Sequence, residues 1–412
     1  MHPIPLIAAS LLLALEPVSC RDPGNDARQE PVSVRLLDAA SLERLREAHA
    51  VGSPLYRDEI AELIQESDKR LRQEAYSVTQ KKILPPSGDL HDYLSWSRYW
   101  WPDSTKPGGL PYVRRDGKVN PEIMNIPDHE NLVRMVAATN TLALGYALTG
   151  NRRYSDKAVQ ILTRWFIDPE TRMNPNLAYS QLIPGRTAVR GTGILDGRKF
   201  CTLVDAITIL EASGSMSPDV GRKLRSWFSQ YFEWLTTSEH GLLEAAATNN
   251  HGTWYDVQVV AIALYNGKTS HARSVLERAK RSRIEELIEP DGSQPSELAR
   301  TRSWHYSIFN LEALTRLARM AESVSVDLWN HSSSDGRSIA AALKYLAPFA
   351  SGESPWPHEE LGTVSNQAYA DLLVLAARGC TDPDLRRLAE SFGGSSLEVQ
   401  QLTELTDRST QP

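Results

Sequence analysis

The sequence predicts an all-α protein, an α/α toroid in which helices pair into an inner and an outer layer. Apolar residues recur at helical spacing along most of the 412 residues, which is typical of helices with a buried face. Gly, Pro or Asn stands at almost every joint between these stretches. No alternation of apolar and polar residues is long enough to indicate a sheet. Helices joined by alternately short and long connections most simply form concentric pairs, and we expect six or seven.

The N-terminus predicts export. Residues 4–15 are apolar but too few to span a bilayer, and residues 1–20 together are typical of a signal peptide. The sequence Val18-Ser19-Cys20 resembles the end of a bacterial lipoprotein signal, so the chain is either lipidated at Cys20 or cleaved nearby. Residues 21–34 are polar and are expected to form a linker. The expected location is the periplasm, the outer membrane as a lipoprotein, or the outside of the cell.

The folded domain is expected over residues 35–395, with a polar tail at 396–412. Its first two helices are predicted at 41–50 and 56–76. After an irregular stretch from 85 to 131, helical spacing predicts further helices at 130–148, 153–166, 199–212, 217–236, 253–265, 269–288, 304–321, 337–347, 364–377 and 384–391.

Composition excludes some classes of partner. The net charge is −6 and the pI is about 6.0, with no dense run of Lys or Arg, so we expect no nucleic-acid partner. Ten Trp and fourteen Tyr offer aromatic faces, a usual platform for sugar rings. Beyond the signal peptide only Cys201 and Cys380 remain, which predicts no disulfide framework and leaves a single bridge between them open.

Two irregular segments contain candidate substrate-binding residues. The segment 85–131 interleaves aromatic residues with Arg and Asn, among them Trp100 and Arg114. A loop of this length is usually functional, and its rings could stack on a sugar acid while the guanidinium groups meet carboxylates. The alternative is that the rings pin the loop to the domain. The segment 174–193 contains Tyr179, Gln181 and Arg190, near glycines that permit close approach of the backbone to a ligand.

Residues 247–256 form the densest polar and aromatic cluster in the chain, with Asn249, Asn250, His251 and Trp254. Tandem Asn is unfavourable inside a helix, yet an apolar helix follows at once, so the cluster is expected where a buried helix begins. Such a helix start suits a bound carboxylate. A single Asn would more simply be a helix cap and a single His a core residue, whereas the whole cluster favours a site.

A second cluster lies at 289–306, where Arg300, Arg302, His305 and Tyr306 fall within seven residues. If a helix begins by Leu298, Arg302 and Tyr306 share one face, and Arg300 and His305 point elsewhere.

Asn250, His251, Arg300 and Tyr306 are the groups that β-elimination on a uronic acid requires. The proton on C5 is only weakly acidic until the neighbouring carboxylate is neutralised, which Asn and Arg can do. One group must then remove this proton and one must protonate O4. His251 and Tyr306 are the available acid and base.

These residues also carry a resemblance to a known family. The sequence resembles the alginate lyase superfamily of polysaccharide lyases, with the stretches Asn249-Asn250-His251-Gly252-Thr253-Trp254 and Pro295-Ser296-Glu297-Leu298-Ala299-Arg300 followed by Tyr306. The resemblance extends loosely from residue 92 to 377. It implies an α/α toroid, an extracytoplasmic location, and catalysis by Asn250, His251, Arg300 and Tyr306.

Departures from the family pattern concern the substrate. Here His305 precedes Tyr306, and residues 99–112 resemble a divergent branch that acts on alginate or glucuronan. In mannuronate and glucuronate H5 and O4 lie on the same side of the ring, so one tyrosine could serve both ends of the elimination. Guluronate has them on opposite sides and needs a separate base, for which His251 is the candidate. We therefore expect an anionic polyuronate, with polymannuronate preferred within alginate, or glucuronan.

Two other functions stay open. Inverting glycoside hydrolases also use α/α toroids, and Glu297 and Asp256 would then be the two carboxylates. An inactive surface protein that binds polysaccharide is the second alternative. No cofactor or metal is expected, because no His-x-x-x-His or paired Cys spacing occurs. We expect His358, with the two glutamates after it, to line the substrate site or cap a helix.

Overall fold

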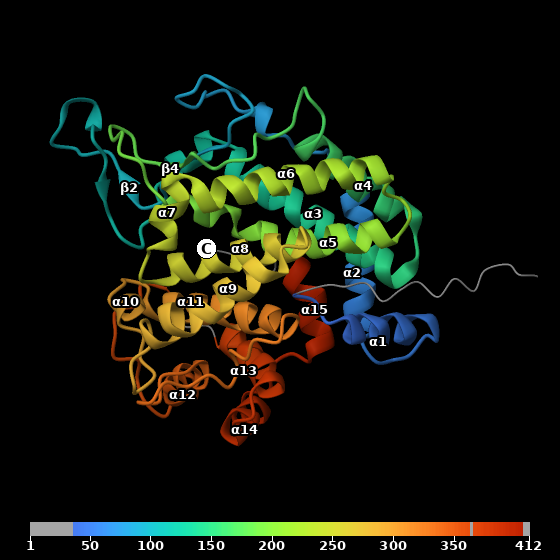
Figure 1. Ribbon diagram of the computed structural model, residues 1–412, viewed down its shortest axis with the longest axis vertical. Coiled ribbons are helices and arrows are strands. Elements are labelled where there is room, and N and C mark those ends of the chain that lie inside the picture. Colours follow the sequence, from blue (N-terminus) through green and yellow to red (C-terminus); the bar gives the residue numbers. More distant parts are fainter. Residues whose placement is uncertain (1–35, 363–365, 407–412) are drawn as a thin grey trace, which may run out of the picture. The chain divides into compact units, whose positions relative to one another are not determined.

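Helices dominate the part of the chain that the computed structural model describes, residues 36–362 and 366–406 (Figure 1). The α-helices there are numbered α1 to α15, and the four strands contain two to four residues each. The predicted all-α class is confirmed. The predicted signal peptide with Cys20 and the linker at 21–34 lie outside the described residues. Within the described ranges, no helix has the length and apolar character needed to cross a membrane.

A row of buried helices forms the inner layer, and each packs against the next. In order these are α3 (Asp128–Thr149), α5 (Phe200–Ala212), α8 (Asn250–Tyr265), α11 (Ser303–Glu322) and α13 (Gln367–Gly379). Except in α13, most residues of these helices are buried, as is expected of helices enclosed by neighbours. In α8 every residue except His251 and Leu264 is buried. The helix that begins at the predicted site therefore belongs to the core.

The outer layer alternates with this row along the chain. Its helices are α4 (Arg152–Phe166), α6 (Pro218–Thr237), α9 (Thr269–Ala279), α12 (Ile339–Ala350) and α14 (Pro383–Phe392), and the pair α1 (Ala39–Ala50) and α2 (Arg57–Leu71) precedes α3. Aromatic rings join the layers, as where Phe200 of α5 meets Phe166 of α4 and Phe228 of α6. Five inner and outer pairs, together with the pair α1 and α2, make six helix pairs in the described residues, at the lower end of the predicted range.

Four elements differ from the sequence prediction. The helix predicted at 269–288 ends at Ala279 and continues as a π-helical turn, η5 (Lys280–Glu285). Short helices α7 (Glu239–Ala245) and α10 (Pro295–Leu298) precede α8 and α11. Residues 397–406 lie in the predicted polar tail but form helix α15 (Leu397–Thr406). This helix docks because Leu402 is buried and Glu398 pairs with Arg44 of α1.

The strands lie around the irregular segment predicted between residues 85 and 131. Strand β1 (Leu94–Trp96) pairs in parallel with β4 (Tyr179–Leu182), and β2 (Trp100–Trp101) pairs antiparallel with β3 (Val113–Arg114). We call residues 98–122, which contain β2 and β3, the arm. Its base is closed by two backbone bonds, from Asn120 to Arg98 (2.7 Å) and from Arg115 to Tyr99 (2.7 Å). Strands of this length carry too few residues to show an alternating pattern.

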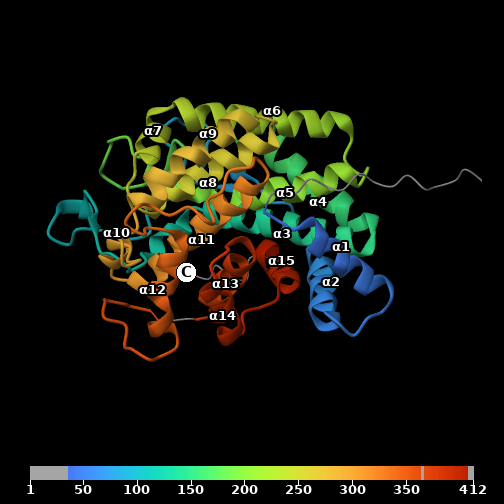
Figure 2. The same cartoon turned by 60° about the horizontal axis from the view of Figure 1, so that its bottom comes forward.

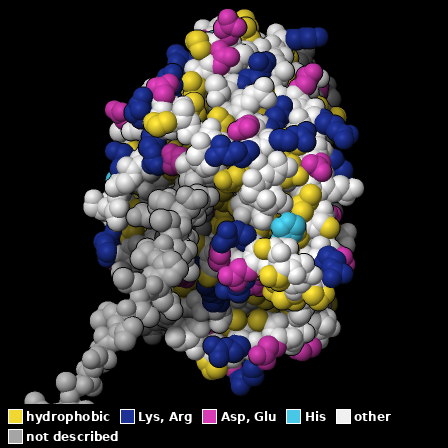
Figure 3. Space-filling view, turned by 90° about the vertical axis from the view of Figure 1, so that its right-hand side faces the viewer, with side chains coloured by type: hydrophobic (Ala, Val, Ile, Leu, Met, Phe, Trp, Pro, Cys, Tyr) yellow, Lys and Arg dark blue, Asp and Glu magenta, His cyan; other side chains and the backbone are white. Residues whose placement is uncertain are grey.

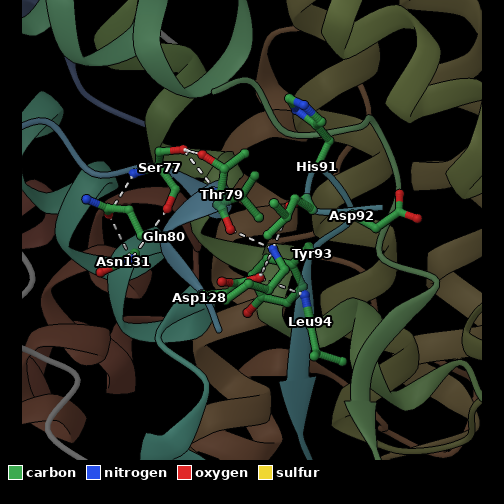
Figure 4. Close-up of polar contacts among 12 residues, drawn as sticks. Ser77, Thr79, Gln80, His91, Asp92, Tyr93, Leu94, Asp128 and Asn131 are labelled. Atoms are coloured by element: carbon green, nitrogen blue, oxygen red, sulfur yellow. Dashed lines mark hydrogen bonds and ion pairs between the residues drawn. The ribbon is translucent and has the colours of Figure 1, made fainter. Parts of the chain in front are cut away.

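Polar contacts fix β1 on the start of α3 (Figure 4). Asp128 of α3 accepts a hydrogen bond from the backbone of Leu94 (2.9 Å) and pairs with buried Lys81 (2.8 Å). Burial raises the pKa of Asp128 to about 6, although Lys81 opposes this shift. Asn131 bonds Gln80 in the 3-10 turn η1 (Val78–Gln80). These contacts fix the position of β1, from which the chain continues into the arm.

The elements that carry the predicted site gather at one end of the helical layers. The arm, α7 and α10 lie on the left in both Figure 1 and Figure 2. On the face at the right of Figure 1, Lys and Arg side chains mix with Asp and Glu over the surface that is not grey (Figure 3). The part of that face that is not grey shows no continuous patch of only positive or only negative side chains. The thiols of Cys201 and Cys380 are both free and buried, so no bridge joins them.

Candidate active site

The start of α8 is held by a carboxylate of the protein itself. Asn249 caps the helix, because its side-chain oxygen accepts from the backbone of His251 (3.0 Å). The backbone N–H and the side-chain Nδ2 of Asn250 both donate to Glu297, each at 2.7 Å. This helix start was predicted to bind a carboxylate, and the carboxylate bound there is that of Glu297 from the same chain.

Burial changes the roles expected of both asparagines. Asn250 was predicted to neutralise the substrate carboxylate, but its side chain is 0% exposed and its amide is used by Glu297. Asn250 therefore supports the site from the core, through its hydrogen bonds to Glu297. Asn249 was predicted to contact the sugar, and its side-chain oxygen is committed to the cap.

His251 is the residue through which the start of α8 reaches the surface. Its Nδ1 lies 2.6 Å from a carboxylate oxygen of Glu244, which is buried in α7. Because Nδ1 is used in this way, Nε2 is the nitrogen that can serve a substrate. A buried carboxylate on one imidazole nitrogen fixes the ring and its tautomer. Sequence reasoning did not find Glu244, which lies in a short polar helix seven residues before its partner.

A buried ion pair holds α7 and α8 together behind this histidine. Arg283 of η5 donates from Nε to Asp256 (2.8 Å) and from its other nitrogens to the carbonyls of Ala245 and Ala247 (2.7 and 2.9 Å). Burial raises the pKa of Asp256, and the charge of Arg283 opposes the shift. The π-helical turn, a feature common at functional sites, places this arginine beneath the connection that carries His251.

Arg300 and Tyr306 form the second half of the site. α10 ends at Leu298 and α11 begins at Ser303, so Arg300 lies in a break between helices. The expectation that a helix starting by Leu298 points Arg300 away from Tyr306 is therefore wrong. The break turns the chain so that the guanidinium carbon of Arg300 lies 3.7 Å from the centre of the Tyr306 ring.

The phenol of Tyr306 is nearly enclosed, with 8% of the residue exposed. Its hydroxyl donates to the hydroxyl of Tyr99 in the arm (3.1 Å). Burial raises the pKa of Tyr306 and the neighbouring Tyr99 raises it further, while the positive charge of Arg300 lowers it. The arginine thus favours the phenolate, the form in which Tyr306 would act as a base.

The arm is latched to Arg300 by one carboxylate. Asp116 follows β3 and accepts from Nε and Nη2 of Arg300 (3.1 and 2.8 Å), as well as from the backbone of Thr301 (3.3 Å) and from Arg114 (2.7 Å). Burial opposes ionisation of Asp116, but Arg300 outweighs it and holds the pKa of this carboxyl well below its usual range. Arg114, predicted to bind substrate, is exposed beside this latch.

Arg190, Gln181 and Trp100 lie together at the base of the arm. Arg190 donates to the hydroxyl of Ser97 (3.3 Å) and the carbonyl of Gln181 (3.4 Å), and its guanidinium carbon is 5.7 Å from the Trp100 ring. Burial and the charge of Arg186 lower the pKa of Arg190. A cation held in this way suits an incoming carboxylate.

The side chain of Gln181 is engaged within the protein. It donates to Asp196 (2.8 Å) in the 3-10 helix η4 (Thr192–Lys199), and the same carboxylate accepts from the hydroxyls of Ser95 (2.6 Å) and Tyr93 (3.0 Å). The backbone of Gln181 has a left-handed φ of 47°, a conformation unusual for a residue other than glycine. Tyr179 is half-buried in β4, where it pairs with Leu94 of β1.

Around the start of α11, His305 stacks on Phe309 with an interplanar angle of 9°. Burial lowers the pKa of His305 to about 4, and the charges of Arg302 and Arg98 lower it in the same direction. His305 is therefore neutral at neutral pH. Arg302 lies 3.9 Å from Glu360, whose other oxygen accepts from the backbone at the start of α11.

Two predicted binding residues lie elsewhere. The Trp254 ring is buried against Phe309, to whose carbonyl it donates (3.2 Å), so it packs the core instead of stacking on a sugar. His358 contacts the hydroxyl of Tyr345 and the ring of Trp356. The neighbouring Glu360 provides the helix cap that was one of the two roles expected for this segment.

Electrostatic contacts join the two halves of the site. Burial raises the pKa of Glu297, while its bonds to Asn250 and the charges of Arg300 and His251 lower it. Groups from both halves of the site therefore act on this one buried carboxyl. Glu297 and Asp256, the two carboxylates considered for hydrolysis, are both buried and committed to these internal contacts. In the residues that the structure describes, no group of three His, Cys, Asp or Glu could hold a metal ion.

Comparison with known proteins agrees with this arrangement. The sequence matches the family profile described as alginate lyase over residues 77–356. The chain belongs to the alginate lyase family. It is a polysaccharide lyase, and its α/α toroid is the fold of that family. No curated protein matches its sequence.

Solved structures of alginate lyases share the fold. The chain is 37% identical to an alginate lyase from Bacteroides ovatus, with a TM-score of 0.86, and the match covers 90% of this chain and 99% of that one. It is 19% identical to alginate lyase A1-III from Sphingomonas species A1, with a TM-score of 0.56 over 87% and 91% of the two chains. A variant of A1-III complexed with a tetrasaccharide matches at 17% identity, with a TM-score of 0.57 over 88% and 92%.

Proposed function

We propose that this lyase cleaves a 1,4-linked polyuronate by β-elimination and leaves an unsaturated uronate at the new non-reducing end. The substrate is alginate, with polymannuronate preferred, or glucuronan. The observation that carries the proposal is the Arg300 guanidinium stacked 3.7 Å from the centre of the Tyr306 ring. Its relatives named alginate lyases, one of them with a bound tetrasaccharide, support an anionic polysaccharide as the ligand.

The reaction needs three tasks, and the site offers a group for each. Arg300 and the imidazole of His251 draw charge from the substrate carboxylate, which makes the C5 proton more acidic. Tyr306, as the phenolate, removes that proton. The same proton then passes to O4 while the C4–O4 bond breaks and the C4–C5 double bond forms. Asn250 and Glu244 hold His251 and the start of α8 in place.

The arm and its base supply the contacts to neighbouring sugars. Trp100, Arg114 and Arg190 present one ring and two cations, and aromatic faces and guanidinium groups suit sugar rings and uronate carboxylates. Arg302 and His305 lie at the start of α11, where His305 contacts the Tyr306 ring, and half-buried Tyr179 is the last residue of the set.

The choice among polymers follows from the positions of the two reacting groups. Tyr306 as both base and acid suits mannuronate and glucuronate, in which H5 and O4 lie on the same side. Elimination on guluronate requires a base on the opposite side, and His251 has Nε2 to offer. His251→Ala is therefore expected to impair cleavage of polyguluronate more than cleavage of polymannuronate.

The experiment is incubation of the purified enzyme with polymannuronate, polyguluronate and glucuronan, followed by ultraviolet absorbance of the conjugated alkene. Rising absorbance with at least one polymer supports the proposal. New reducing ends without absorbance would identify a hydrolase, the alternative in which Glu297 and Asp256 supply the carboxylates. Binding without either product would identify an inactive polysaccharide-binding protein.

We further propose that the enzyme is exported by the segment 1–20 and acts outside the cytoplasm. Expression of the full chain in a bacterial host, with fractionation and labelling by radioactive palmitate, separates the outcomes. Label that disappears in Cys20→Ala means a lipoprotein, and unlabelled enzyme in the periplasm or medium means ordinary cleavage. Retention of uncleaved enzyme in the cytoplasm would refute export.

A further inference from the structure

One guanidinium group binds the connection between α7 and α8 at two points. Nη2 of Arg283 donates to the carbonyl of Ala245 (2.7 Å), the last residue of α7, and Nη1 donates to the carbonyl of Ala247 (2.9 Å) in the connection. Nε of the same side chain donates to Asp256 in the second turn of α8 (2.8 Å). The Arg283 side chain is only 5% exposed, so these three bonds form away from solvent.

This connection separates the His251 imidazole from its carboxylate partner. Glu244 lies in the last turn of α7 and His251 in the first turn of α8, and their side chains meet at 2.6 Å. Residues 246–249 lie between the two helices, so the meeting depends on how α7 is placed on α8. Arg283 binds the residue directly after Glu244 and, through Asp256, the helix that carries His251.

The residue after His251 has the shape that this arrangement requires. Gly252 is buried in α8, where glycine is less favourable than alanine. A β-carbon at Gly252 would lie 2.5 Å from Nη1 of Arg283 and nearer still to the carbonyl oxygen of Ala247. Glycine therefore lets both the guanidinium group and the connection pack against the first turn of α8.

The other end of α8 is held by the same kind of contact. Arg225 of α6 donates to the carbonyl of Tyr265, the last residue of α8, and to the carboxylate of Glu211, each at 2.6 Å. Two arginines thus each join a carboxylate to the backbone, one beneath His251 and one at the far end of the same helix. Arg225 is therefore a chemically matched reference for Arg283.

We propose that Arg283 is a positioning residue of the elimination, which acts through the connection to fix the Glu244 carboxylate against His251 and so directs Nε2 of His251 at the substrate. Lysine in its place has one nitrogen instead of three and cannot bind Asp256 and both carbonyls in the same directions. Its charge keeps a partner for Asp256 while the connection is released. The proposal rests on the proposed lyase function, in which His251 acts on the substrate.

The test is kcat and KM of Arg283→Lys on the polymer that the wild type cleaves best, measured with and without His251→Ala. Alone, Arg283→Lys is expected to lower kcat about 10- to 100-fold, as small displacements of a catalytic group do, and to change KM little. In the His251→Ala background it is expected to change kcat by less than about twofold, because its effect passes through His251. Two losses that multiply independently would overturn the proposal, since they would mean that Arg283 only supports the fold.

A second variant and two controls separate position from stability. Gly252→Ala keeps the guanidinium group but forces a β-carbon against it, and the same loss of kcat with the same dependence on His251 is expected. Its control is Gly221→Ala in α6, where a β-carbon meets nothing nearer than 3.6 Å. Arg225→Lys is the control for Arg283→Lys, and both controls are expected to keep wild-type kcat. An equal loss in Arg225→Lys, or full activity in both test variants, would contradict the proposal.

A spectroscopic measurement does not depend on activity. In protein with ¹⁵N-labelled histidine, the imidazole signals that His251→Ala removes report the contact between Nδ1 and Glu244. Arg283→Lys and Gly252→Ala are expected to shift these signals and to speed exchange of the Nδ1 proton with solvent, and unchanged signals in the folded variants would refute the proposal. If no polyuronate yields an unsaturated product, the lyase proposal fails, and these signals still decide whether Arg283 positions the imidazole.

Discussion

The start of α8 and the arm both contact the segment from Glu297 to Tyr306, but different kinds of contact hold them. At the start of α8 the groups are buried: Glu297 binds Asn250, and Arg283 binds Asp256 beneath them. The arm consists of two short strands and loops, and it reaches the site through Asp116 and the hydroxyl of Tyr99. Substitutions in the first region should therefore act on stability and activity together, whereas substitutions in the arm should act on activity alone.

The largest effect is expected where the two regions meet. Tyr306→Phe keeps the ring and removes the hydroxyl that we propose as acid and base, so turnover should fall by ~10²–10⁴-fold or more. The initial rate of absorbance increase measures it, with circular dichroism to confirm folding. Tyr154→Phe is the control, because the Tyr154 hydroxyl donates to Asp68 (2.9 Å) and neither residue is part of the candidate site. Near wild-type turnover in Tyr306→Phe would mean that the phenol only packs.

The ion pair beneath α8 is the place to test the buried region. Arg283→Met leaves the Asp256 carboxylate buried without its partner, which should lower the free energy of unfolding by about 3–5 kcal/mol. Urea denaturation measures this. Arg278→Met is the control, because Arg278 is half exposed and 3.8 Å from the same carboxylate, and it should cost less than about 1 kcal/mol. Equal losses would show that the region does not depend on the buried pair.

The pKa of His305 allows a test based on how the free energy of unfolding depends on pH. Its pKa is about 4 in the folded protein and 6.5 ordinarily, so between these values the unfolded chain binds a proton that the folded chain does not. The free energy of unfolding should therefore fall by about 1–3 kcal/mol as pH drops from 6.5 to 4. His305→Gln should lack this part of the decline. Parallel curves of unfolding free energy against pH for the two proteins would contradict the assignment.

The contact between Asp116 and Arg300 provides the corresponding test in the arm. Asp116→Asn keeps the shape but removes the charge that holds Arg300 through two hydrogen bonds, so kcat/KM should fall about tenfold, a loss of about 1.4 kcal/mol. Thermal unfolding should change little. Asp103→Asn, also in the arm but bonded to Thr105, should keep full activity. A loss of stability as large as that of Arg283→Met would abolish the distinction between the two regions.

The smallest effect is expected at the base of the arm. Arg190→Ala removes a cation that we propose contacts the substrate equally in the ground and transition states, which should raise KM about three- to tenfold and leave kcat unchanged. Steady-state kinetics on the preferred polymer measure both constants, with exposed Arg222→Ala of α6 as the control. If neither constant changes, Arg190 is not part of the substrate site.

Local patterns explain which parts were predictable. Helix positions follow from apolar spacing and from residues such as Gly150, whose left-handed φ of 68° ends α3. The cluster at 249–251 stood out because its residues are unfavourable inside a helix. Asp116 and Tyr99 gave no such signal, since their partners Arg300 and Tyr306 lie 184 and 207 residues away. Burial also decided roles that composition could not, as with Trp254, which looks like a sugar platform and packs the core.

The bond between Glu297 and Asn250 also bears on how activity returns during refolding. It joins residues 47 positions apart. The bond therefore forms only after the chain that contains α9 and η5 has closed into a long loop, and closing that loop lowers the entropy of the chain. The start of α8 has no internal partner for its first amide until then. Catalytic competence should therefore return no earlier than the docking of α10 on α8, later than the recovery of helical circular dichroism.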